Sequence, residues 1–195
     1  MSAQEKWDKI YSQAGKKHPP ACAALRDNSH LLPSSGKALD IACGLGSNAL
    51  FLAEQGLRTD AWDISPVAIE KLQQTASQQA LPLTATQTDL STLKPATEQY
   101  DVIVVSHYLD RPFCHTIISM LKPEGLLFYQ TFTAEKVTPE GPSSPAFVLA
   151  KNELLQLFSA LELVVYREEG LVGDKSRGFR NQAMLVAMKA RTAGK

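Results

Sequence analysis

The chain has 195 residues, of which 44% are apolar, and its 20 basic side chains balance its 20 acidic ones. This size and apolar content suit one hydrophobic core, so we expect residues 1–195 to form a single domain. The even charge, with no basic run, argues against a nucleic-acid partner, and no apolar stretch is long enough to span a membrane.

The three cysteines, Cys22, Cys43 and Cys114, have neither the spacing of a zinc site nor the even number of a disulfide framework. We therefore expect no metal site. The first residues lack the apolar core of a signal peptide. Together these features predict a cytoplasmic protein, monomeric or homodimeric, that acts on a small molecule and does not bind membranes.

Residues 2–14 place Trp7, Ile10 and Tyr11 at helical spacing, which predicts a helix with one apolar stripe. Such a stripe packs on a core in the simpler interpretation. In the alternative, Trp7 and Tyr11 form a lid that covers a cofactor and excludes water.

A second helix is expected over residues 21–32, between a Pro-Pro break and a Pro-Ser-Ser-Gly turn. Residues 1–33 would then form an N-terminal helical lid segment. Residues 37–189 would form the core of the domain.

A glycine-rich turn follows the first predicted strand, residues 37–42, and leads into a helix. Such a turn leaves backbone N–H groups free at the positive end of the helix, and glycine lets a ligand approach closely. The spacing Gly44-x-Gly46-x-x-Ala49 fits the dinucleotide-binding fingerprint. A tight turn that binds nothing is the alternative.

Two acids narrow the choice of ligand. Asp63 follows Gly44 by 19 residues, as a ribose-binding acid does in dinucleotide enzymes. Asp40 lies on the strand four residues before Gly44, where its carboxylate would repel a pyrophosphate and attract an ammonium group. This position favours S-adenosylmethionine over a nicotinamide dinucleotide.

The stretch Asp40-Ile41-Ala42-Cys43-Gly44-Leu45-Gly46 resembles the first motif of the class I S-adenosylmethionine-dependent methyltransferases, with Ala42 in place of the first glycine. The resemblance implies an α/β, Rossmann-like, doubly wound seven-stranded sheet, mostly parallel with an antiparallel last strand and with helices on both faces. It also implies S-adenosyl-L-methionine as cofactor. The residues we expect to contact it are Trp7, Tyr11, Asp40, Ala42, Cys43, Gly44, Gly46, Asn48, Asp63, Ile64, Asp89, Leu90 and Ser106.

The next two predicted strands each end at an acid. A strand over residues 57–62 leads to Asp63, in the crevice where open α/β sheets bind ligands, and Asp63 is expected to hold the ribose hydroxyls. Ser65 caps the helix that follows it over residues 67–80. After a weaker strand over 83–87, the resemblance gives Asp89 the adenine amino group, although Asp is also a common turn residue.

Residues 100–106, YDVIVVS, form a β-branched run typical of a strand that is buried on both faces. The strand ends at the stretch Ser106-His107-Tyr108-Leu109-Asp110-Arg111, directly over the expected methyl group. No [DNS]-P-P-[YFW] signature follows, and no Pro-Cys nucleophile occurs, which counts against methylation of a DNA base.

The rest of the chain predicts further alternation of helices and strands, followed by an antiparallel hairpin. The expected elements are a helix at 111–122, a turn at 122–125, a strand at 126–132, a loop at 133–145, a helix at 152–161 capped by Asn152, and strands at 162–168 and 183–189.

Within the methyltransferases, the D-A-W-D and P-A-F-V-L-A-K-N-E-L segments look similar to the tellurite-resistance methyltransferases. That resemblance implies tellurium or selenium oxyanions, or other small soft nucleophiles, as acceptors. Arginine forks match oxyanions, so Arg111, Arg177 and Arg180 are candidate anion-binding residues.

Four residues at strand ends complete the predicted acceptor side. His107 is a candidate base and Tyr108 a candidate for orienting the acceptor, while Gln130 and Phe132 are expected to line the pocket. Two other classes of function stay open: an NAD(P)-dependent oxidoreductase, and a protein that binds S-adenosylmethionine without catalysis.

Overall fold

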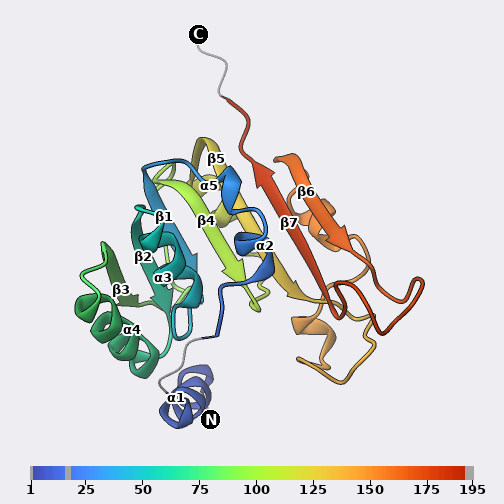
Figure 1. The fold of residues 1–195 in the computed structure, drawn as a ribbon, viewed down its shortest axis with the longest axis horizontal. Coiled ribbons are helices and arrows are strands. Elements are labelled where there is room, and N and C mark those ends of the chain that lie inside the picture. Colours follow the sequence, from blue (N-terminus) through green and yellow to red (C-terminus); the bar gives the residue numbers. More distant parts are fainter. Residues whose placement is uncertain (1, 16–18, 192–195) are drawn as a thin grey trace.

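The computed structural model describes residues 2–15 and 19–191. Its seven strands form one sheet in the order β3-β2-β1-β4-β5-β7-β6 (Figure 1). Strands β1 to β5 are parallel, and β7 runs antiparallel between β5 and β6. The strands are β1 Lys37–Ile41, β2 Arg58–Asp63, β3 Leu83–Gln87, β4 Tyr100–Ser106, β5 Leu121–Phe132, β6 Glu162–Glu168 and β7 Gln182–Met188.

Helices cover both faces of this sheet, which confirms the predicted fold class. Among the described residues, none of the helices is long and apolar enough to cross a membrane. The helices are α1 Ala3–Gln13, α2 Ala23–Arg26, α3 Ser47–Glu54, α4 Pro66–Gln78, α5 Cys114–Met120 and α6 Glu153–Leu157, with 3-10 turns at Ser29–Leu31 and Pro145–Phe147.

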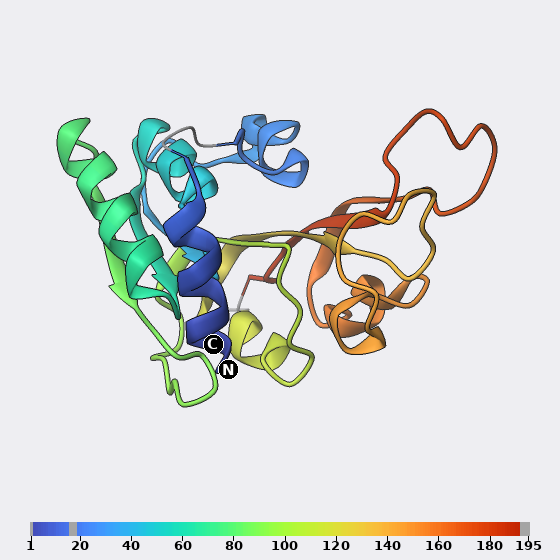
Figure 2. The same cartoon turned by 90° about the horizontal axis from the view of Figure 1, so that it is seen from below.

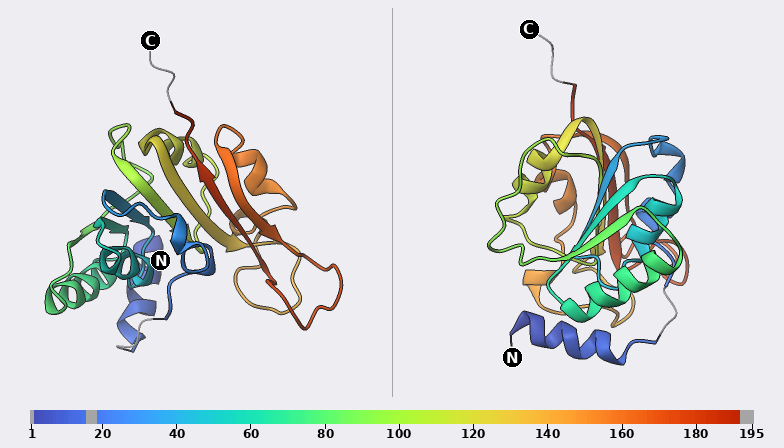
Figure 3. Two further views of the ribbon diagram at one scale, coloured as in Figure 1. Left: turned by 45° about the horizontal axis from the view of Figure 1, so that its top comes forward. Right: turned by 90° about the vertical axis from the view of Figure 1, so that its left-hand side faces the viewer.

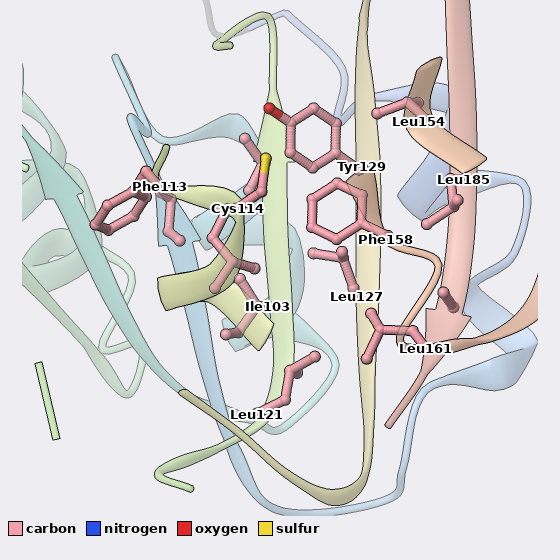
Figure 4. Packing of buried hydrophobic residues seen from close by; sticks show 14 of the residues in the cluster. Ile103, Phe113, Cys114, Leu121, Leu127, Tyr129, Leu154, Phe158, Leu161 and Leu185 are labelled. Atoms are coloured by element: carbon pink, nitrogen blue, oxygen red, sulfur yellow. The ribbon is translucent and has the colours of Figure 1, made fainter. Parts of the chain in front are cut away.

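Alternate residues of the central strands build two separate cores, because successive side chains of a strand point to opposite faces. On one face, side chains such as Ile103, Leu127 and Tyr129 pack against α5 and α6 (Figure 4). There the rings of Tyr129 and Phe158 lie 5.2 Å apart. On the other face, residues such as Val104 pack against α2 and α3.

The helix expected over residues 21–32 is wrong in its length. It ends at Arg26, because the side chain of the buried Asn28 donates to the Ala24 carbonyl at 2.9 Å. That carbonyl is the one that a continuing helix would bond to the backbone of residue 28. A single 3-10 turn, Ser29–Leu31, follows the break.

Three boundaries in the second half of the chain also differ from the prediction. Helix α5 starts only at Cys114, and β5 begins at Leu121 instead of after a turn at 122–125, since Leu121 already pairs with Tyr100. Asn152 is the N-cap residue of α6, as predicted, but its φ is 60° and its side chain makes no capping bond, and α6 ends at Leu157.

Helix α1 lies outside the two cores, across the carboxyl ends of the first strands (Figures 2 and 3). It packs beside α4, and none of the residues Ala3–Gln13, all of which are described, is buried. Its start is well formed, because Ser2 and Glu5 make a reciprocal capping box. Helix α1, Ala3–Gln13, therefore covers the strand ends, and we call it the roof of that region.

Candidate functional site

A cavity of about 790 Å³ opens at the carboxyl ends of the parallel strands. The segments that follow β1, β2, β3 and β4 line it, and so do residues of α1. This is where open α/β sheets bind ligands, at the point where the strand order reverses.

The glycine-rich turn forms one wall and has the backbone conformation that its sequence predicts. Gly44 has a φ of 54° and Gly46, the N-cap of α3, has a φ of 82°, while Ala42 also takes a left-handed φ of 52°. A Cβ atom added to Gly44 would lie 2.8 Å from the hydroxyl oxygen of Tyr11. Glycine is therefore required where the turn meets the roof.

Asp40 lies directly behind this turn and is fully buried. Its carboxylate accepts from the Ala49 N–H at 3.1 Å and from the Asn48 side chain at 3.4 Å, and burial raises its pKa to about 7. Asp40 does not line the described part of the cavity, whereas Asn48 does. Asn48 in turn donates to Ser106 Oγ at 2.9 Å and accepts from the Cys22 N–H at 2.9 Å, so it joins three walls.

Asp63 lies at the end of β2 and is only 5% exposed. Its two oxygens accept from the Gly44 N–H at 2.8 Å and the Ser65 N–H at 2.9 Å, and burial raises its pKa. Each carboxylate oxygen can accept a further hydrogen bond. The acid is thus rigidly held and still able to receive hydroxyl groups.

Asp89 follows β3 and lies on the surface of the cavity. It forms an Asx turn, in which one oxygen accepts from the Ser91 N–H at 2.9 Å and the Ser91 hydroxyl at 2.7 Å, and these bonds lower its pKa. Asp89 therefore forms a turn, as aspartate commonly does, and its second carboxylate oxygen is available to a ligand.

Polar bonds, not buried side chains, hold the roof in place. Lys71 of α4 donates to the carbonyl oxygens of Tyr11 at 2.6 Å and Ala14 at 3.2 Å, and Ser65 donates to Asp8. The ring of Trp7 stacks on that of Tyr11 at 5.5 Å and is 38% exposed. Helix α1 is therefore attached in the way a movable lid would be, since little apolar burial opposes its opening.

His107 and Tyr108 form the wall at the end of β4. His107 has a φ of 55°, which is rare for a residue other than glycine, and its ring lies 4.9 Å from that of Phe132. Burial lowers the pKa of His107. The pKa of the Tyr108 hydroxyl is raised, so it stays protonated and able to donate.

The predicted arginines do not meet the cavity. Arg111 is bound to Glu153 at 2.5 Å and to the carbonyl oxygens of Ala146 and Val148. Arg180 donates to four carbonyl groups of the loop 169–177, and Arg177 is exposed in that loop. The side chains of Arg111 and Arg180 organise loops of the second half of the chain instead of facing the site.

Most of the predicted cofactor residues do come together, because they follow neighbouring parallel strands. The predicted residues that line the cavity are Trp7, Tyr11, Ala42, Cys43, Gly44, Asn48, Asp63, Ile64, Asp89, Leu90, Ser106, His107 and Tyr108. Those outside its described lining are Asp40, Gly46, Arg111, Gln130, Phe132, Arg177 and Arg180.

Several residues in or beside the site are not among the predicted contact residues. Pro19, Pro20 and Cys22 lie on the cavity wall, and Asp110 also lines it. Gln182, the first residue of β7, contacts His107 from a strand far along the chain. Only the double proline marks an irregular segment, and nothing in its spacing places it at a ligand site.

Comparisons with known proteins agree with this geometry. Residues 16–189 match the family described as "Tellurite resistance protein TehB". Hemagglutinin 1 of Eikenella corrodens is 31% identical over 169 residues, covering 81% of this chain and 55% of that protein. A probable S-adenosyl-L-methionine-dependent methyltransferase TehB of Haemophilus influenzae is 29% identical over 138 residues, covering 68% and 48%.

A solved structure shares the fold of this chain. The crystal structure of TehB from Haemophilus influenzae superposes with a TM-score of 0.69 at 22% identity, covering 95% of this chain and 66% of that one. The chain spans about half the length of the curated relatives it matches.

Proposed function

The chain belongs to the TehB family of tellurite resistance proteins, and from this premise we propose that it transfers a methyl group from S-adenosyl-L-methionine to a small-molecule acceptor. The observation that carries the proposal is the wall formed by Gly44, Asp63 and Tyr11. It joins a left-handed glycine turn, a buried acid at the next strand end and an aromatic roof around one cavity.

The residues present fit this cofactor. Asp63 is held by two backbone N–H groups and suits the ribose hydroxyls, and Asp89 with Leu90 suits the adenine. The left-handed turn at Gly44 lines the cavity beneath the Tyr11 hydroxyl, which suits the aminoacyl part. Asn48 lines the cavity beside the same part and is held there by Asp40, Ser106 and the Cys22 N–H.

When bound, S-adenosylmethionine supplies a methyl group on a positively charged sulfonium. The residues of the cavity hold the two reactants in line, an effect that can supply roughly 7–11 kcal/mol of a barrier. Helix α1 excludes water from the reacting groups through Trp7 and Tyr11. The family description makes tellurite a candidate acceptor, and the resemblance found in the sequence adds selenium oxyanions.

Ligand-induced thermal stabilisation tests the proposal. S-adenosylmethionine and S-adenosylhomocysteine should raise the melting temperature, and NAD should leave it unchanged. Stabilisation by NAD alone would favour an oxidoreductase and refute the proposal. With labelled cofactor and a panel of selenite, tellurite and small thiols, label should pass to at least one acceptor; none leaving the cofactor would indicate binding without catalysis.

A further inference from the structure

We propose, on the basis of the function proposed above, that Gln182 and Gln130 hold His107 in the tautomer protonated at Nε2. Its Nδ1 atom then receives the proton of a neutral, thiol-bearing acceptor. Gln182 contacts the His107 ring, and Gln130 contacts Gln182, while neither lines the described part of the cavity. Both therefore act as positioning residues for the base.

The tautomer follows from a chain of hydrogen bonds that starts at a backbone donor. The Ala24 N–H can only donate, and it bonds Gln130 Oε1 at 2.8 Å. Gln130 must therefore turn its Nε2 toward Gln182, whose Oε1 accepts at 2.7 Å. The same Oε1 lies 3.2 Å from His107 Nε2. Because that oxygen can only accept, His107 Nε2 must carry the proton.

The backbone fixes the ring of His107 as firmly as the side chains do. The His107 N–H donates to the Gln130 carbonyl at 2.9 Å, and the left-handed φ of 55° directs the residue away from the strand. Phe132 packs against the ring at 4.9 Å. A strained residue that is held from several sides and lines a cavity is typical of a functional site.

The surroundings of the ring also favour its neutral form. Burial lowers its pKa, and this outweighs Gln182 and Glu140, which both raise it. Other charged groups nearby are Lys136, whose ammonium lies 5.5 Å from the centre of the Phe132 ring, and Asp110, which receives the Tyr108 hydroxyl at 3.4 Å. A neutral ring protonated at Nε2 has its lone pair on Nδ1.

The charge of the cavity indicates the class of acceptor. Its described lining includes Asp63, Asp89 and Asp110 and contains neither lysine nor arginine. With Asp63 and Asp89 taken up by the cofactor, an oxyanion acceptor would meet Asp110 and no lysine or arginine of the described lining, at an electrostatic cost. A neutral thiol meets no such repulsion, and it needs the base that His107 provides.

The proposed step balances in atoms and charge. The S–H bond of the acceptor breaks and its proton moves to His107 Nδ1, while the sulfur electron pair forms the new bond to the methyl carbon. The old carbon–sulfonium bond breaks, and its electrons neutralise the sulfur of the cofactor. The imidazolium then returns its proton to water.

Histidine ring nitrogen NMR tests the positioning without any turnover. In the protein labelled with ¹⁵N-histidine, His107 should show a protonated Nε2 and an unprotonated Nδ1 at neutral pH, and Gln182→Ala should produce a mixture of tautomers. A protonated Nδ1 in the wild type, or an unchanged spectrum in Gln182→Ala, would overturn the assignment. Gln79→Ala, an exposed glutamine of the surface, is the matched control.

Kinetics with 2-mercaptoethanol and selenite test the base. His107→Ala should lower kcat/KM for the thiol by at least about 100-fold, and Gln182→Ala by about 10-fold, with unchanged affinity for S-adenosylhomocysteine. Gln182→Glu should move the rise of thiol activity to higher pH, because a carboxylate raises the pKa of His107. Equal losses with both acceptors, or an unshifted pH profile, would refute the base role. If no acceptor is methylated, the proposed function fails, while the NMR still decides the tautomer.

Discussion

Replacing Gly44 by alanine tests the central wall of the site. Gly44 has a φ of 54°, where an L-residue costs about 1–2 kcal/mol. The added methyl would lie 2.8 Å from Tyr11 Oη and 3.3 Å from Tyr11 Cζ, so the tyrosine must move. Since α1 has no buried residue among Ala3–Gln13, we expect the roof to shift and the core to stay intact.

The expected result is a modest loss of stability and a large loss of binding. A cost of about 1–2 kcal/mol lowers the melting temperature of a domain of this size by roughly 2–8 °C. The affinity for S-adenosylhomocysteine should fall more than about 10-fold, because the displaced tyrosine leaves the aminoacyl part of the cofactor exposed to water. Calorimetric titration and thermal melts of the same samples measure both effects.

Gly56 provides a matched control. Its φ is 89°, and no atom lies within 4 Å of an added Cβ. Gly56→Ala should therefore destabilise the fold to a similar degree and leave cofactor affinity unchanged. Wild-type affinity in Gly44→Ala, or an equal loss of affinity in Gly56→Ala, would refute the reasoning.

Four further predictions follow from other contacts. Asp63→Asn leaves one acceptor oxygen for two backbone N–H groups. Titration should show that the affinity for S-adenosylhomocysteine falls at least about 10-fold, and urea melts should show that the free energy of unfolding falls by about 1–3 kcal/mol. Binding with wild-type affinity would contradict this prediction. Asp40 has a folded pKa of about 7, above its unfolded value. Its contribution to stability is therefore present at acidic pH and is lost as the pH rises from about 4 to 7. Urea melts of Asp40→Asn should lack that part of the decline, and stability curves parallel to those of the wild type would count against the assignment. Lys71→Ala removes the bonds to the end of α1 and should make that helix more sensitive to protease and weaken cofactor binding several-fold; unaltered cleavage would disprove the anchoring role. Arg180→Ala should expose loop 169–177 to protease without changing cofactor affinity, because its side chain bonds only carbonyl groups and Glu169 in the described structure; a loss of affinity would instead favour a role at the site.

The fold could be predicted where the pattern is local. Residues 100–106 and 162–168 form strands with the expected bounds, because continuous or alternating apolar runs determine a strand without help from elsewhere. The predicted helix boundaries were wrong where a polar side chain bonds, or changes the conformation of, the backbone. Asn28 ends α2 because its side chain bonds a helix carbonyl, and Asn152 takes the N-cap position of α6 in a left-handed conformation, without a side-chain bond to the helix.

The cofactor side of the site was also predictable, since Gly44, Asp63 and Asp89 follow consecutive strands and the fold brings such ends together. The acceptor side was not. Arg111 is paired with Glu153, 42 residues away in sequence, and no local signal reveals that partner. Gln182 was missed for the same reason, because its contact with His107 spans 75 residues.

A crystal structure of the complex with S-adenosylhomocysteine tests the central claim most directly. The account predicts that the ribose hydroxyls bond Asp63, the aminoacyl part lies on the turn at Gly44 beneath Tyr11, and the sulfur faces His107. A ligand bound outside this cavity, or one whose ribose is held by residues other than Asp63, would contradict it.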